Sequence, residues 1–135
     1  MRPTRLLPVV LGAALLVVAV SLRSPSPAAP AGAKELATAR VEAARATFEA
    51  YKASAAVGRD PAEAIYTWSV RWLTAQLDAG AKAPAALEDH LQRMKELEAA
   101  VKTRVAQGLA GKTEAEAAAY YRTEAEYWAA RKKMK

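Results

Sequence analysis

The 135-residue chain contains no cysteine, one histidine and one phenylalanine. The lack of cysteine excludes disulfides, zinc–thiolate sites, thiol nucleophiles and haem attached through cysteine. About a quarter of the residues are alanine, which favours helix because it loses no side-chain entropy there, but which buries little apolar area. The core must therefore be built from a small number of leucine, valine, isoleucine, tryptophan and tyrosine side chains.

The charge distribution argues against nucleic-acid binding. The net charge is +6, but seven of the basic residues lie near the two ends of the chain, and residues 34–130 hold 13 basic against 14 acidic side chains. A basic cluster at the end of a helix suits the helix dipole and is readily solvated. The alternative is a weak contact with anionic lipid. The C-terminal cluster consists of Arg131, Lys132, Lys133 and Lys135.

Residues 1–23 have the pattern of an export signal. Arg2 and Arg5 precede an apolar run from residue 6 to residue 22, which no charge interrupts. Seventeen residues are at the short edge of what crosses a bilayer. Two alternatives stay open: a cleaved signal peptide, or an uncleaved anchor that places residues 6–22 in the membrane. Both predict an exported protein, either periplasmic or anchored in an inner membrane and facing the periplasm.

A proline-rich linker and a helical domain follow. Residues 24–33 contain three prolines, which disfavour helix and favour extended polyproline conformations. From residue 34 onward, apolar residues recur at helical spacing, and short connections favour antiparallel neighbours. The sequence therefore predicts an all-α domain over 34–135, either two antiparallel helical hairpins or a small four-helix bundle. The helices are expected at about 34–57, 61–79, 84–107 and 114–133.

Helix starts and stops are marked by capping residues. Asp60 and Pro61 suit the N-cap and first position of the second helix. Thr113, with Glu116 three residues later, predicts a capping box for the fourth helix. Gly108 fits the position just after the third helix.

The two halves of the domain resemble each other. Each has a long helix that ends in Ala-x-Gly, then a capped turn and an aromatic-rich helix. Tyr66 aligns with Tyr121, and Trp72 aligns with Tyr127. Duplication of a helical hairpin produces this pattern, and so does coincidence in alanine-rich sequence.

Residues 101–131 resemble the coiled-coil hairpins of TolC-type outer-membrane efflux proteins. Two segments carry the resemblance. Val-Lys-Thr-Arg-Val-Ala-Gln-Gly is the end of a helix and the turn after it, and Thr-Glu-Ala-Glu-Ala-Ala-Ala-Tyr-Tyr-Arg-Thr-Glu-Ala-Glu is the start of a second, Ala/Glu-rich helix. The chain has no pattern of barrel strands and is several-fold too short for a channel, so the resemblance implies a free-standing hairpin unit. The chain is also similar to small exported Ala/Glu-rich helical bacterial proteins of unknown function.

A second resemblance is to periplasmic helical chaperones of the Spy/CpxP kind. Their hallmark is Leu-Thr-x-x-Gln, and this chain has Leu73-Thr74-Ala75-Gln76, which is one residue shorter. The resemblance implies a chaperone or stress adaptor.

The sequence contains no pattern that predicts catalysis or a cofactor. His90 and Met94 share a helix face and could contact a soft metal, but a site needs more ligands. The favoured interpretation is an ordinary, partly exposed histidine, with no metal and no cofactor. Acidic residues two apart point to different helix faces, so they do not form an acid–base pair. Gly111-Lys112-Thr113 lacks the earlier glycine and the strand of a phosphate loop, so it predicts a turn.

The aromatic residues are the most prominent feature. Seven of them occupy the second and fourth expected helices, where they either fill a core that alanine cannot fill or form a surface for a partner helix. The candidate interaction surface consists of Trp68, Trp72, Tyr121 and Trp128.

We therefore expect a non-enzymatic helical protein of the cell envelope that acts by protein–protein interaction or self-association. One alternative is a periplasmic chaperone or stress adaptor. Another is a four-helix bundle that binds a small ligand or a metal.

Overall fold

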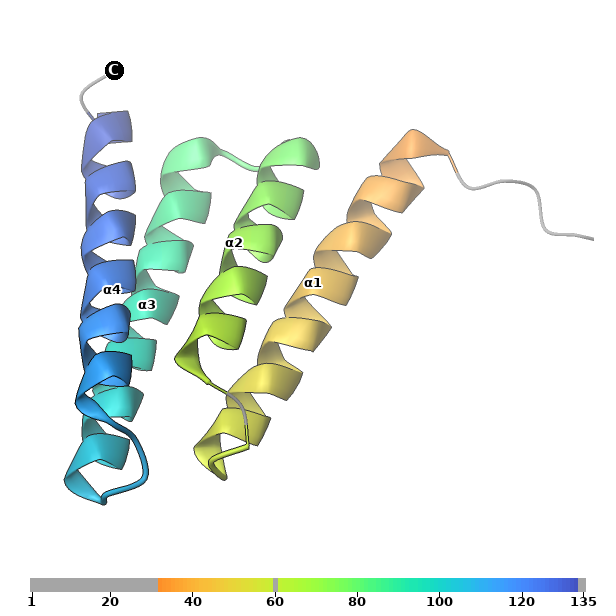
Figure 1. The fold of residues 1–135 in the computed structure, drawn as a ribbon. Coiled ribbons are helices and arrows are strands. Elements are labelled where there is room, and N and C mark those ends of the chain that lie inside the picture. The colour runs from red at the N-terminus through yellow and green to blue at the C-terminus, as the bar shows by residue number, and fades with distance from the viewer. Residues whose placement is uncertain (1–31, 60, 134–135) are drawn as a thin grey trace, which may run out of the picture.

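The computed structural model describes residues 32–59 and 61–133. The predicted signal or anchor at 1–23, the linker up to residue 31 and the predicted N-cap Asp60 lie outside the described residues. The described part contains four α-helices and no strand, which confirms the all-α prediction (Figure 1). The helices are α1 (Ala33–Ala56), α2 (Ala62–Asp78), α3 (Ala83–Ala106) and α4 (Lys112–Lys133).

Three of these helices end in the same glycine turn. Gly58, Gly80 and Gly108 follow α1, α2 and α3, and each has φ between 70° and 91°, a conformation that favours glycine. After α3, the amide of Gly108 donates to the Val105 carbonyl at 3.0 Å, and that of Leu109 donates to the Arg104 carbonyl at 2.8 Å. This is the Schellman pattern, which closes a helix with a rigid turn.

The start of α2 is held by another helix. Its N-cap is Pro61, which makes no side-chain cap hydrogen bond. The amide of Ala62 instead donates to Glu114 Oε1 of α4 at 3.2 Å. The predicted capping box at Thr113 is wrong, because α4 begins at Lys112, two residues before the expected start at 114, and Glu116 lies against Lys112, 3.6 Å away.

Consecutive helices run antiparallel, with α2 and α3 between α1 and α4 (Figure 1). Helix α2 packs against all three others, as its wide apolar surface predicts. Helix α4 packs against α3 and α2, while α1 packs mainly against α2. Half of the buried apolar residues are alanine, and the tryptophan and tyrosine side chains that were expected in the core pack against it only partly buried. The larger buried residues are Phe48, Ile65, Leu73, Leu87, Leu91, Met94, Leu97 and Val101.

Within residues 32–59 and 61–133, none of the helices combines the length and the apolar character needed to cross a bilayer.

Candidate functional site

The four aromatic residues proposed as an interaction surface are half-buried, and each contacts another ring within the chain. Trp68 stacks on Tyr51 with ring centroids 6.3 Å apart, and Trp72 packs against Phe48 at 5.5 Å. Both contacts lie between α1 and α2.

The other two of these residues lie on α4. Tyr121 stacks on Tyr66 of α2 at 4.0 Å, and Trp128 stacks on His90 of α3 at 5.6 Å. The structure thus brings the four residues to separate helix interfaces rather than to one strip. Their role in binding a partner stays a prediction.

A buried polar cluster joins α2 and α3. Ser69 Oγ lies 2.8 Å from His90 Nδ1, and Arg93 Nε donates to the same Ser69 oxygen at 2.7 Å. Arg93 Nη2 also donates to the Ser69 backbone carbonyl at 3.4 Å. Because Arg93 supplies a hydrogen to Ser69 Oγ, the serine hydroxyl is free to donate its own hydrogen to His90. With this donor direction, the imidazole hydrogen lies on Nε2; if Ser69 Oγ accepts from both residues, it lies on Nδ1.

His90 is fully buried, so the expectation of a partly exposed histidine is wrong. Burial lowers the pKa of His90 to about 4, and the neighbouring Arg93 cation acts in the same direction. Because the Ser69 side chain is small, it leaves room for the imidazole in the α2–α3 interface, and its hydroxyl forms a hydrogen bond with His90 Nδ1. His90 Nε2 is buried without a hydrogen-bond partner among the described residues.

Arg93 is 8% exposed, and its guanidinium lies against aromatic rings. Its central carbon is 4.2 Å from the Trp72 ring centroid and 5.8 Å from that of Phe48. Such cation–π contacts partly compensate a desolvated charge. Burial nevertheless lowers the pKa of Arg93 to about 10, although Asp89, Glu49 and Glu96 act in the opposite direction. In residues 32–59 and 61–133, none of the recorded ion pairs includes Arg93.

Next to Arg93, a cavity of about 150 Å³ lies between α1 and α3. Its apolar lining includes Phe48, Ala55, Ile65, Leu97 and Val101. Its charged lining consists of Lys52, Arg93, Glu96 and Arg104.

Two of the three cations at this cavity are paired. Lys52 Nζ lies 3.0 Å from Glu96 Oε2, and Arg104 Nη1 lies 2.9 Å from Glu114 Oε1. The carboxylate of Glu114 therefore forms an ion pair with Arg104 and also accepts a hydrogen bond from the first amide of α2. Arg93 is the cation at this cavity that lacks a carboxylate within ion-pair distance among the described residues.

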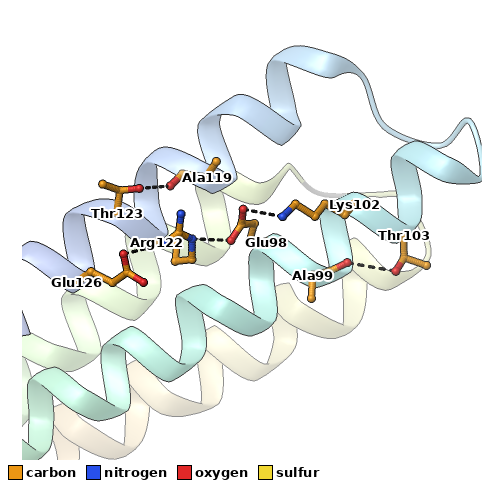
Figure 2. A network of polar contacts seen from close by, with 8 residues as sticks. All are labelled: Glu98, Ala99, Lys102, Thr103, Ala119, Arg122, Thr123 and Glu126. Atoms are coloured by element: carbon orange, nitrogen blue, oxygen red, sulfur yellow. Dashed lines mark hydrogen bonds and ion pairs between the residues drawn. The ribbon is translucent and has the colours of Figure 1, made fainter.

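The opposite side of α3 carries an ion-pair network with α4 (Figure 2). Glu98 accepts from Lys102 at 2.9 Å and from Arg122 of α4 at 2.7 Å. Arg122 also contacts Glu126 at 2.6 Å. Hydrogen bonding to these cations lowers the pKa of Glu98. Glu98, which interrupts the apolar stripe of α3, thus joins α3 to α4.

The cluster chemistry does not resemble a working catalytic site. A serine beside a histidine can form a nucleophile–base pair, but Ser69 and His90 are both fully buried, so no substrate reaches them in this arrangement. A histidine with a pKa of about 4 is also a weak base at neutral pH. In the part of the chain that the structure describes, no cluster of three metal-binding side chains occurs.

Exposed apolar side chains lie at both ends of the helical array. Val57 follows α1 and is 70% exposed, and Leu109 follows α3 and is 61% exposed. The turns that carry these two residues are at the same end of the molecule (Figure 1). Leu36 and Tyr127 are exposed near the other end. We call the end that bears Val57, Val105 and Leu109 the tip.

Comparison of the chain with models of known families, with curated proteins and with solved structures finds no match. The fold and the side-chain geometry are therefore the basis for any functional argument.

The sequence did not point to Ser69 or Arg93 as a buried pair. Both residue types are usually exposed, and Arg93 follows the polar residue Gln92. The available signal was spacing: Arg93 is three residues after His90 and next to Met94, so it lies beside the apolar stripe of α3.

Proposed function

We propose that this chain is a non-enzymatic helical protein of the cell envelope that acts by protein–protein contact through its tip, with self-association as the first form of contact to test. The observation that carries the proposal is the exposure of Val57 and Leu109 on turns at the same end of the molecule. A group of exposed apolar residues at one end of a molecule supports an interaction site there, whereas apolar residues scattered singly over a surface do not.

The rigidity of the tip supports this proposal. Arg59 donates its amide to the Ser54 carbonyl at 3.1 Å, and the corresponding bond after α3 runs from Leu109 to Arg104. Turns already closed by backbone hydrogen bonds lose little conformational entropy when they bind. The export pattern in residues 1–23 supports the envelope location. The start of α1 lies at the opposite end from the tip, so an anchor there would leave the tip free (Figure 1).

The test is sedimentation velocity of the full chain over a wide concentration range, in one fixed non-ionic detergent. We expect association that increases with concentration and weakens in the double variant Val57→Ser, Leu109→Ser. Leu36→Ser is the matched control, because Leu36 is 59% exposed at the other end. A chain that stays monomeric at every concentration contradicts self-association. An equal effect of Leu36→Ser contradicts the assignment to the tip.

A further inference from the structure

The cavity between α1 and α3 has the size and lining of a small-ligand site. Its volume of about 150 Å³ is that of an apolar cavity able to hold a benzene ring. Phe48 and Ile65 line it from α1 and α2, and Leu97 and Val101 line it from α3. These side chains favour the hydrocarbon part of a ligand over water.

Arg93 gives this apolar cavity a specific chemical preference. A buried charge without a counter-ion is costly, and most such charges in proteins are paired. Lys52 and Arg104 at the same cavity are both paired, at 3.0 and 2.9 Å. Arg93 has only neutral partners in close contact, namely Ser69 and two aromatic rings.

The surroundings of Arg93 also define the charge of a suitable ligand. Nε and one hydrogen of Nη2 donate to Ser69, which leaves three of the five guanidinium hydrogens, two on Nη1 and one on Nη2, for a ligand. Asp89, Glu49 and Glu96 act electrostatically on Arg93. These carboxylates repel any anion at Arg93, and the repulsion increases with each negative charge on the ligand. A single planar carboxylate, which can pair with one guanidinium, is therefore favoured over a phosphate dianion.

We propose that the α1–α3 cavity binds a small apolar carboxylate, with its carboxylate paired to the Arg93 guanidinium and its hydrocarbon part against Phe48, Leu97 and Val101. The ligand class is an aromatic or short aliphatic acid of about six to seven carbons, by comparison with the cavity volume. This inference does not rest on contact through the tip, because it uses different residues.

The test uses benzoate as the charged probe and benzamide as its neutral counterpart of nearly the same shape. Each probe is titrated into the full chain, which is held in lipid nanodiscs without detergent because it includes the apolar run in residues 1–23. The readout is the NMR signal of the Trp72 indole N–H, because the Trp72 ring lies against Arg93. We expect saturable binding of benzoate at least about tenfold tighter than that of benzamide, as a charge-assisted hydrogen bond requires.

Two variants with matched controls separate the charge from the cavity. Arg93→Met should abolish the preference for benzoate, whereas Arg71→Met should keep it, because Arg71 lies 4.6 Å over Trp68 but is exposed and does not line the cavity. Ala100→Leu, at the exposed rim of the cavity, should weaken both probes, whereas its neighbour Ala99→Leu should not.

Equal affinity for benzoate and benzamide, or failure of both to bind the unaltered chain, overturns the proposal whether or not any variant folds. An unchanged preference in Arg93→Met overturns it as well. Arg93→Met should fold, because replacing an unpaired buried charge by an apolar side chain of similar length is often neutral or stabilising.

Discussion

Helices α1 and α4 flank the same central pair, α2 and α3 (Figure 1). On the α1 side, a cavity of about 150 Å³ lies between α1 and α3. On the α4 side, Ala118, Ala125 and Ala129 are buried, and small side chains let α4 approach α3 closely. Tyr121 and Trp128 then fill the interface through their stacks on Tyr66 and His90.

On the α1 side, both helices contribute alanine to the lining of the cavity. Ala55 of α1 and Ala100 of α3 both line the cavity, and Lys52 extends to Glu96 at its rim. Phe48 is the one large apolar side chain that α1 contributes to this lining. On the α4 side, buried alanines lie beside aromatic stacks, whereas on the α1 side the cavity lining combines alanines with one large apolar side chain of α1.

The largest expected effect is on the α1 side. Phe48→Ala should reduce the free energy of unfolding by about 3–5 kcal/mol, because it enlarges an existing cavity and removes the ring packed on Trp72. Urea unfolding measures the effect, with Tyr127→Ala as an exposed control that should change stability by less than about 0.5 kcal/mol. A loss below 1 kcal/mol for Phe48→Ala would mean that α1 does not depend on this residue.

The second effect tests the α3–α4 side through its buried imidazole. The unfolded chain should protonate His90 near its ordinary pKa of 6.5, and the folded chain only near 4. The free energy of unfolding should therefore be highest above pH 6.5 and decrease by about 3 kcal/mol as the pH falls towards 4. Urea unfolding at several pH values measures this dependence.

His90 is the only histidine in the chain, so His90→Gln serves as the control for this pH dependence. The variant should flatten the profile between pH 5 and 6.5, where carboxylates change little. An identical slope in both proteins would contradict the burial of a neutral imidazole.

The third effect compares overpacking on the two sides. Ala125→Leu should destabilise the α4 interface by about 1–3 kcal/mol, because Ala125 is fully buried and a larger side chain overpacks such a site. Ala130→Leu, on the exposed face of the same helix, is the matched control and should be nearly neutral. Thermal melting detects both, and equal melting temperatures would show that α4 is not tightly packed.

The smallest effect is the same type of substitution at the open side. Ala100→Leu should change the free energy of unfolding by no more than about 0.5 kcal/mol, because the leucine enters space that is already empty. A cost similar to that of Ala125→Leu would remove the distinction between the two sides.

The sequence was sufficient to predict the helices because their signals are local. The terminal glycines, Gly58, Gly80 and Gly108, mark turns with positive φ, and the helical spacing of apolar residues continues between them. The cap of α2 by Glu114 was not predictable, because it depends on how α4 packs against α2.

The candidate site could not be predicted for a similar reason. Nothing in the local sequence marks Arg93 as buried, and the cavity depends on how residues of α1, α2 and α3 come together around it. The aromatic residues were correctly recognised as prominent, but their division among separate interfaces depends on helix rotation, which the alanine-rich pattern does not define.

The difference in packing between the α1 side and the α4 side is tested most directly by native-state hydrogen exchange of the full chain, with and without benzoate. Amides of α1 should exchange through openings of lower free energy than those of α3 and α4, and benzoate should slow exchange mainly in α1 and the facing part of α3. Equal protection of α1 and α4, unchanged by benzoate, would contradict the account of one closed side and one open, ligand-binding side.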